Sequence, residues 1–184
     1  MKLHLIRHCR TDANSKGKLS CDIDEPLNTD GIRQATLLSD YLKTLGIDEI
    51  WCSPLLRARQ TLSPLLDCSQ TEPVFLPLLC EGHLNLDSSA PISAPEFSAE
   101  SGFPMATESV GSFRGRVAAI LSRARAVDVD RTVLCLTRGH FIRETLNIFL
   151  DAANYTRFPI GNCSDTLVEF GKDQIIHYVN RTTI

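Results

Sequence analysis

The sequence of 184 residues has little of several features that mark specialised proteins. Its net charge is only −3, so no basic surface for nucleic acid is expected, and an anionic ligand would need a local cluster of arginines. No apolar run approaches the length of a membrane span, and Met1-Lys2 leads into a short apolar run without a signal-peptide pattern. These absences predict a cytoplasmic protein with no nucleic-acid or membrane partner.

The seven cysteines are an odd number and include no C-x-x-C pair. This spacing disfavours both a structural zinc site and a secreted disulfide framework, so reduced and mostly buried thiols are expected. Cys9 and Cys21 are the candidates for an exception, because both lie in predicted loops near one candidate site and could oxidise together. Internal repeats, low-complexity tracts and heptads are lacking too, and the length suits a single domain over residues 1–184.

What the chain does contain is an alternation of short apolar runs with helical patterns. This alternation predicts an α/β fold of three α/β/α layers, with a mostly parallel central sheet and helices on both faces. Strands are expected at residues 3–6, 49–52, 74–76 and 132–136, a final hairpin at 165–170 and 174–180, and helices at 29–45, after Ser53-Pro54, at 108–127 and at 141–150. Residues 82–107 are rich in Ser, Ala, Pro and Gly and form a predicted lid or substrate loop.

Helix ends can also be predicted. Thr29 is the expected N-cap of the first long helix, and Gly46 ends it. Ser53-Pro54 should supply the N-cap and N1 proline of the next helix. The apolar stripe of the first long helix comprises Ala35, Leu38, Leu42 and Leu45, widened by Ile32 and Tyr41.

Polar residues follow the predicted strands at the edge where ligands bind in open α/β sheets. Arg7-His8 ends the first strand, Arg57 lies near the start of the helix after the second, and Arg138-Gly139-His140 follows strand 132–136. Glu81 stands just before the predicted lid. An imidazole there can attack a phosphorus atom while guanidiniums hold the phosphate oxygens. For Arg7-His8 taken alone, a solvated turn is the simpler alternative.

This set resembles the histidine phosphatase superfamily, in its phosphoglycerate-mutase-like branch. The resemblance rests on four ordered blocks. The first is Leu5-Ile6-Arg7-His8-Cys9-Arg10-Thr11 with Asn14, the second is Asp24, Pro26-Leu27, Gly31 and Gln34-Ala35, and the third is Ser53-Pro54-Leu55-Leu56-Arg57-Ala58-Arg59-Gln60-Thr61. The fourth is Thr137-Arg138-Gly139, aligned through the preceding strand and the downstream Ile142-Arg143. The blocks cover most of the chain.

The resemblance implies a role for each matched residue. His8 would be the nucleophile that takes the phosphoryl group, and Arg7 and Arg57 would bind phosphate oxygens. Glu81 would protonate the leaving oxygen and later activate water, helped by apolar neighbours that raise its pKa. Asn14 would add a hydrogen bond to phosphate. Neither a cofactor nor a metal is expected, because the site residues form no metal-ligand cluster.

The departures from the family pattern are equally informative. Arg138 stands where the family has its second histidine, and His140 follows two residues later. Arginine keeps a positive charge and could reach the phosphoryl group, or it could pair with Glu81 and lower the pKa of that acid. Cys9 and Cys21 replace loop glycines, which crowds a backbone that approaches phosphate closely.

Two functions follow. The retained residues favour a phosphatase acting on a small phosphorylated substrate, rather than a mutase, because the predicted lid has few cations. The alternative is a pseudophosphatase that binds a phosphate ligand, inorganic phosphate or a protein without turnover. His83 could line the substrate pocket, and the lid residues Pro91, Phe97, Phe103, Pro104 and Met105 suit a partly apolar leaving group or cover the sheet edge. The sequence leaves the oligomeric state open.

Overall fold

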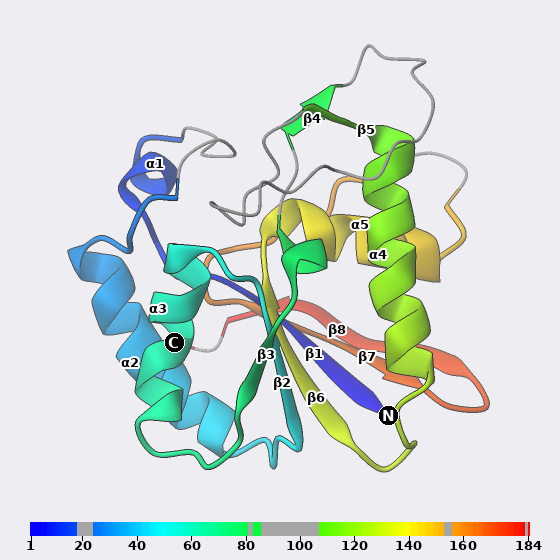
Figure 1. Cartoon of the computed structure of the whole chain (residues 1–184), viewed down its shortest axis with the longest axis horizontal. Helices are drawn as coiled ribbons and strands as arrows, with labels where there is room; N and C mark the ends of the chain where they lie inside the picture. The colour runs from blue at the N-terminus through cyan, green and yellow to red at the C-terminus, as the bar shows by residue number, and fades with distance from the viewer. Residues whose placement is uncertain (18–23, 81–82, 86–106, 153–155, 183) are drawn as a thin grey trace.

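The computed structural model describes residues 1–17, 24–80, 83–85, 107–152, 156–182 and 184. Its centre is a six-stranded sheet with the order β3-β2-β6-β1-β7-β8 (Figure 1). The strands are β1 (Lys2–Arg7), β2 (Glu49–Cys52), β3 (Pro73–Phe75), β6 (Thr132–Thr137), β7 (Asp165–Phe170) and β8 (Gln174–Arg181). The first four of these are parallel, and β7 runs antiparallel to both of its neighbours. The expected mostly parallel sheet is confirmed.

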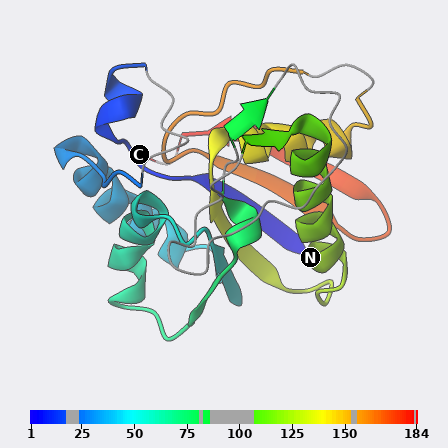
Figure 2. The same ribbon diagram turned by 45° about the horizontal axis from the view of Figure 1, so that its top comes forward.

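Helices cover both faces of the sheet. α2 (Thr29–Lys43) and α3 (Leu56–Leu66) pack on one face, and α4 (Val110–Arg125) and α5 (Gly139–Phe149) pack on the other. A short helix α1 (Asp12–Ser15) follows β1, and β4 (His83–Asn85) pairs in parallel with β5 (Thr107–Ser109) beside the start of α4 (Figure 2). The expected three-layer arrangement is therefore confirmed, although the predicted lid begins and ends in short strands; residues 86–106 lie outside the described part of the chain.

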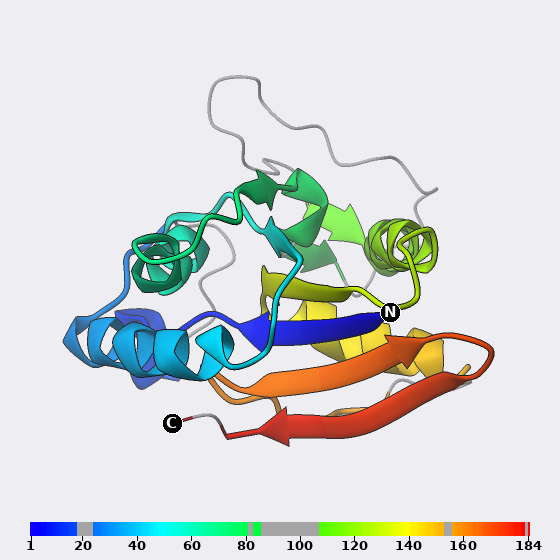
Figure 3. The same cartoon turned by 90° about the horizontal axis from the view of Figure 1, so that it is seen from below.

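Strand alternation divides the core between the two helical layers, which flank the sheet in Figure 3. Leu3 and Leu5 of β1 pack with α4 and α5, whereas Ile6 packs with α2 and α3. In β6, Val133 through Thr137 are all buried. These two central strands are apolar on both faces because both faces are covered, which is why their positions could be predicted. Among the helices described, none has the length and apolar character needed to cross a membrane.

The start of α2 differs from the prediction by one residue. Asn28 is the N-cap, because its side-chain oxygen accepts a hydrogen bond from the Gly31 amide at 2.9 Å, and Thr29 is the first helical residue. Ala35, Leu38 and Leu42 are buried as expected, but Ile32 is 57% exposed and does not belong to the buried stripe. Gly46 ends this segment at φ 63°, a conformation that suits glycine.

The start of α3 lies three residues beyond the predicted Ser53 cap. The amide of Leu56 donates to the Asp24 carboxylate at 2.6 Å, so a side chain from an earlier loop takes the capping role. Ser53 instead accepts a hydrogen bond from the Leu55 amide at 3.4 Å. Arg57 is consequently the second residue of the helix, directly beside the carboxyl end of β2.

Smaller shifts affect three other elements. β3 begins and ends one residue earlier than predicted, α4 begins at Val110 because Ser109 is its N-cap, and α5 begins at Gly139 rather than Phe141. The hairpin of β7 and β8 is confirmed. The prediction for the thiols was wrong at two positions, because Cys9 and Cys163 form a disulfide, so Cys21 is not the partner of Cys9.

Candidate functional site

His8 lies directly after β1 and is completely buried. Its Nδ1 atom is 2.7 Å from the carbonyl oxygen of Cys9. A carbonyl oxygen can only accept, so Nδ1 must carry the proton, and the lone pair of the neutral ring is on Nε2. Nε2 has no hydrogen-bond partner among the described residues. The tautomer therefore leaves the lone pair of Nε2 available to a ligand.

The surroundings of His8 keep the imidazole uncharged. Burial is the largest cause that lowers its pKa well below the usual 6.5, followed by the positive charges of Arg138, Arg57 and Arg7. The hydrogen bond to the Cys9 carbonyl acts in the opposite direction but is weaker. At neutral pH the ring is thus unprotonated, as a nucleophile requires.

Three guanidiniums surround this imidazole and come from three different strand ends. Arg57 in α3 is fully buried, and Arg138 after β6 is 5% exposed. The side chain of Arg7 lies against the backbone of Gly139 and donates a hydrogen bond to the Ile160 carbonyl. Asp24 is 3.9 Å from Arg57 and is partly exposed, so it compensates only a fraction of the positive charge. The predicted convergence of Arg7, His8, Arg57 and Arg138 is therefore present.

The N-terminus of α5 adds to this positive potential. Arg138 is the N-cap residue and makes no side-chain capping bond, and the 11-residue helix begins at Gly139 beside the Arg7 side chain. Backbone amides at such a helix start favour an anion. His140 lies in the first turn and is partly buried. The arrangement suits a doubly charged phosphate group.

Two asparagines connect the loop after β1 to the loop before β7. Asn14, a predicted site residue, accepts hydrogen bonds on its side-chain oxygen from the Thr11 amide at 3.3 Å and from Asn162 Nδ2 at 2.9 Å. Asn162 Nδ2 also donates to the carbonyl oxygen of His8 at 2.9 Å. The oxygen of Asn14 is thus used within the protein, and its amide nitrogen is the group suited to a ligand.

The segment that leads to Glu81 is held by a buried ion pair. Arg116 donates from Nε and Nη2 to the Glu108 carboxylate, and from Nη1 to the carbonyls of Leu78 and Cys80 at 2.6 and 2.7 Å. The Thr137 hydroxyl donates a hydrogen bond to the carbonyl of Leu79 at 2.8 Å. Glu81 and Cys21 lie outside the described residues, and His83 is placed in β4 by its backbone.

Sequence reasoning missed Asp24, Asn162 and Cys163 as parts of this site. Asp24 matches the family pattern, but the pattern assigns it no role, and Asn162-Cys163 belongs to no recognisable motif before the final hairpin. The signal that could have found the latter is the direction of β7. A strand that runs opposite to β1 begins at the edge where β1 ends, so the residues before Asp165 must lie near His8.

The fold and the charges together define an α/β protein with a cationic site at the carboxyl edge of its sheet. Residues 3–181 match the profile of the histidine phosphatase superfamily (branch 1), and the chain belongs to that superfamily.

Individual relatives are phosphatases by name. A probable phosphatase of Schizosaccharomyces pombe is 43% identical over 74 residues, which are 40% of this chain and 35% of the relative. An adenosylcobalamin/alpha-ribazole phosphatase of Salmonella typhi is 40% identical over 81 residues, 44% of this chain and 40% of the relative. The matched stretches thus span well under half of these curated proteins. The structure of an Entamoeba histolytica phosphoserine phosphatase in complex with 3-phosphoglyceric acid superimposes with a TM-score of 0.76 at 25% identity, covering 98% of this chain and 97% of that one.

Proposed function

We propose that this protein is a phosphomonoesterase that hydrolyses small phosphate esters through a phosphohistidine on His8. The observation that carries the proposal is the state of the imidazole. It is neutral, it presents an unpartnered Nε2 among the described residues, and it lies among three guanidiniums. The two named relatives described above act on phosphate esters according to their names, which supports the same class of substrate.

The reaction has two displacements. Nε2 of His8 attacks phosphorus, the ester P–O bond breaks, and the leaving oxygen takes a proton from the Glu81 carboxyl group. A water then attacks the phosphohistidine, its proton passes to the Glu81 carboxylate, and the P–N bond breaks to release inorganic phosphate. Arg7, Arg57 and Arg138 stabilise the charge on the phosphoryl oxygens in both steps. Asn14 and His140 add donors to the same group.

Burial of His8 sets a condition on the substrate. Since the imidazole is 0% exposed, a phosphate ester reaches Nε2 only after a movement that uncovers it. We propose that residues 82–107 act as the lid and that His83 and Cys21 line the substrate side.

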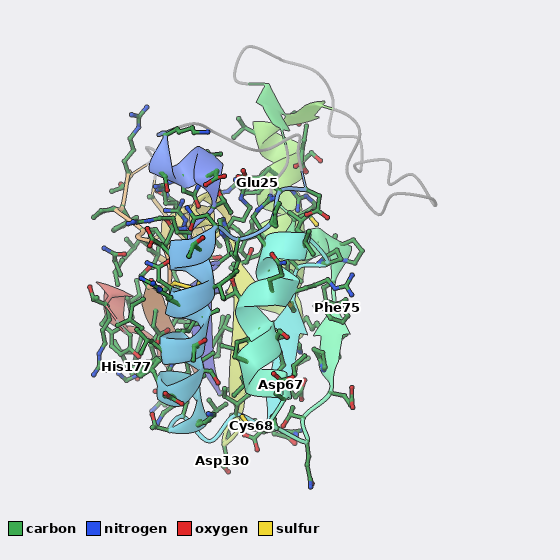
Figure 4. All side chains as sticks on the ribbon, turned by 90° about the vertical axis from the view of Figure 1, so that its left-hand side faces the viewer. Glu25, Asp67, Cys68, Phe75, Asp130 and His177 are labelled. Carbon is green, nitrogen blue, oxygen red and sulfur yellow. A yellow bond between two sulfur atoms is a disulfide. The ribbon has the colours of Figure 1, made fainter. Side chains whose placement is uncertain are left out.

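The test is hydrolysis of p-nitrophenyl phosphate by the wild type and His8→Ala, together with trapping of phosphoprotein that is stable in alkali and labile in acid. We expect the wild type to turn over and to form the phosphoprotein, and His8→Ala to do neither. His177→Gln is the matched control, because that histidine is exposed on β8, far from α1 (Figure 4). Turnover that survives in His8→Ala contradicts the assignment.

Arg138 favours a second candidate function, a phosphate-binding module without turnover. An arginine in place of the second histidine binds ground-state phosphate strongly, and equal stabilisation of ground and transition states gives no rate acceleration. Calorimetric titration with inorganic phosphate and turnover assays of wild type and Arg138→His separate the two. Tight phosphate binding by an inactive wild type, with activity gained in Arg138→His, supports the module. A fall in activity in Arg138→His supports the enzyme.

A further inference from the structure

Cys9 and Cys163 are 154 residues apart in sequence, yet their Cα atoms are 4.9 Å apart and their side chains are buried. Cα separations in disulfides are usually 4.4–6.8 Å. The two cysteines meet because β7 starts at the edge where β1 ends. The disulfide therefore joins the residue after the candidate nucleophile to the loop before β7.

The Cys9 peptide is the direct support of His8. Its carbonyl oxygen accepts a hydrogen bond from His8 Nδ1 at 2.7 Å, and its amide donates to Thr61 Oγ1 in α3 at 2.9 Å. Thr61 in turn donates to the carbonyl of Arg57 at 2.7 Å. Cys9 thus fixes the tautomer of the imidazole and ties it to the helix that carries one of the guanidiniums.

The partner loop holds the same segment from the other side. The amide of Cys163 donates to the carbonyl of Arg7 at 3.1 Å, and Asn162 Nδ2 donates to the carbonyl of His8 at 2.9 Å. The disulfide adds a covalent bond to these hydrogen bonds between residues 7–9 and residues 162–163. Without it, the orientation of the Cys9 carbonyl depends on hydrogen bonds alone.

We propose that the Cys9–Cys163 disulfide positions His8 and makes the site redox-sensitive, so that the oxidised protein holds the imidazole ready for attack and the reduced protein turns over more slowly. The effect of the disulfide on the rate rests on the proposed function of His8. Its effect on the orientation and tautomer of the imidazole is independent of that function.

The Cys9–Cys163 disulfide can form by thiol–disulfide exchange with a low-molecular-weight disulfide such as oxidised glutathione. One cysteine thiolate attacks it to give a mixed disulfide and releases one thiol, and the second cysteine then displaces the other thiol. Two protein thiols lose two electrons and two protons in total, and the glutathione disulfide becomes two thiols. Dithiothreitol reverses the reaction and is itself oxidised to a disulfide.

The experiment compares protein equilibrated with oxidised glutathione and with dithiothreitol, then freed of both. The denatured protein has seven cysteines, so five thiols should react after oxidation and seven after reduction. With p-nitrophenyl phosphate we expect reduction to lower kcat about tenfold or more, because small errors in the placement of a nucleophile are costly, and to leave KM nearly unchanged, because the arginines still bind phosphate.

Two variants provide the controls. Cys163→Ser should have the low kcat of the reduced protein under both conditions. Cys68→Ser should respond to redox like the wild type, since this exposed thiol lies at the far end of α3 from α1 (Figure 4). Equal kcat in the two wild-type forms, or seven reactive thiols after oxidation, overturns the proposal.

A measurement without substrate separates this inference from the proposed function. Nitrogen NMR of histidine-labelled protein, with His8→Gln to assign the signal, reports the tautomer of His8. We expect Nδ1–H in the oxidised form and a mixture after reduction. An identical tautomer in both forms overturns the positioning role even in an active enzyme. A tautomer that responds in a protein without phosphatase activity supports the positioning role and rejects the proposed function.

Discussion

At the scale of single residues, the central feature is an imidazole that stays neutral where its charged form would be unfavourable. Burial of His8 and three nearby guanidiniums act in the same direction on its pKa. The same groups that would attract a phosphate dianion therefore also keep Nε2 unprotonated. In the proposed reaction, one set of charges would support both the binding of phosphate and the attack by the imidazole.

This state predicts a pH dependence of folding stability. The native pKa of His8 lies well below its usual value of 6.5, so below about pH 6.5 the unfolded chain binds a proton that the native state does not. Above pH 6.5 His8 is neutral in both states and does not reduce the stability of the native protein. As the pH falls from 6.5 toward the native pKa, protonation favours the unfolded chain, and the free energy of unfolding decreases. We expect the free energy of unfolding, measured by urea denaturation without phosphate, to fall more steeply between pH 7 and pH 5 in the wild type than in His8→Gln.

The comparison with His8→Gln removes contributions from the other histidines, because both proteins contain them. Parallel pH profiles for the two proteins would contradict a lowered pKa of His8. Added phosphate should reduce the difference, because its negative charge offsets the guanidiniums.

The sequence was sufficient to locate His8 and its three arginines, because each follows a strand whose apolar run is easy to recognise. It was insufficient for the side chains that hold them. Asn162 and Cys163 contact Arg7 and His8 from a loop more than 150 positions away in the chain, and nothing local in their sequence indicates this contact. Long-range partners of this kind depend on strand direction, which residue patterns alone did not specify.

At the scale of elements, the loop after His8 is packed tightly against the start of α2. A Cβ atom at Gly31 would collide with the backbone carbonyl of Arg10. The Arg10 carbonyl also accepts a hydrogen bond from the Asn28 amide at 3.1 Å. The first turn of α2 therefore fixes the backbone two residues beyond the imidazole.

Gly31→Ala should consequently destabilise the protein and impair the site together. The methyl group forces the Arg10 backbone to move, and overpacking of this kind costs about 1–3 kcal/mol in unfolding free energy. We expect a lower urea midpoint and a lower kcat. Gly115→Ala in α4 is the matched control, because nothing lies within 4 Å of its added Cβ, and helix propensity should raise stability by about 0.5–1 kcal/mol. A Gly31→Ala protein as stable and active as the wild type would contradict the close approach.

Element boundaries show where sequence reasoning works and where it fails. β2 and β7 were predicted to the residue, because each apolar run ends in polar residues. The start of α3 was not, because the cap is Asp24, 32 residues before Leu56. Ser53 is a good N-cap by type, but a cap from a distant loop overrides local preference. The N-cap of α2 failed by one residue because Asn28 and Thr29 are both suitable capping types.

At the scale of the whole molecule, one buried carboxylate joins four elements on the side of the sheet covered by α2. Asp165 Oδ2 accepts hydrogen bonds from His4 Nδ1 in β1 at 2.8 Å, from Tyr41 in α2 at 2.6 Å and from Tyr178 in β8 at 2.7 Å. Burial, then the bond to Asp165, raises the pKa of Tyr41, so this phenol stays protonated and donates. The cluster connects the C-terminal hairpin to the rest of the fold.

Asp165→Ala should therefore be strongly destabilising. It leaves the buried His4 without its acceptor, at a cost of about 1–3 kcal/mol, and it removes a hydrogen bond from each of two partly exposed tyrosines. We expect a loss of about 1–3 kcal/mol in the free energy of unfolding by urea denaturation. Asp173→Ala in the exposed hairpin turn should change stability by less than about 0.5 kcal/mol. A similar small change in both variants would show that the cluster contributes little.

The position of β1 between β6 and β7 has a consequence for how the protein is made. Lys2 pairs with Thr132 on one side and with Glu169 on the other. During synthesis β1 leaves the ribosome before either neighbour, because Thr132 and Glu169 are 130 and 167 positions after Lys2. The centre of the sheet can close only after both of these strands have been made. Because these contacts are so far apart in sequence, we expect slow folding, and we expect the apolar β1 to be prone to aggregation until its neighbours pair with it.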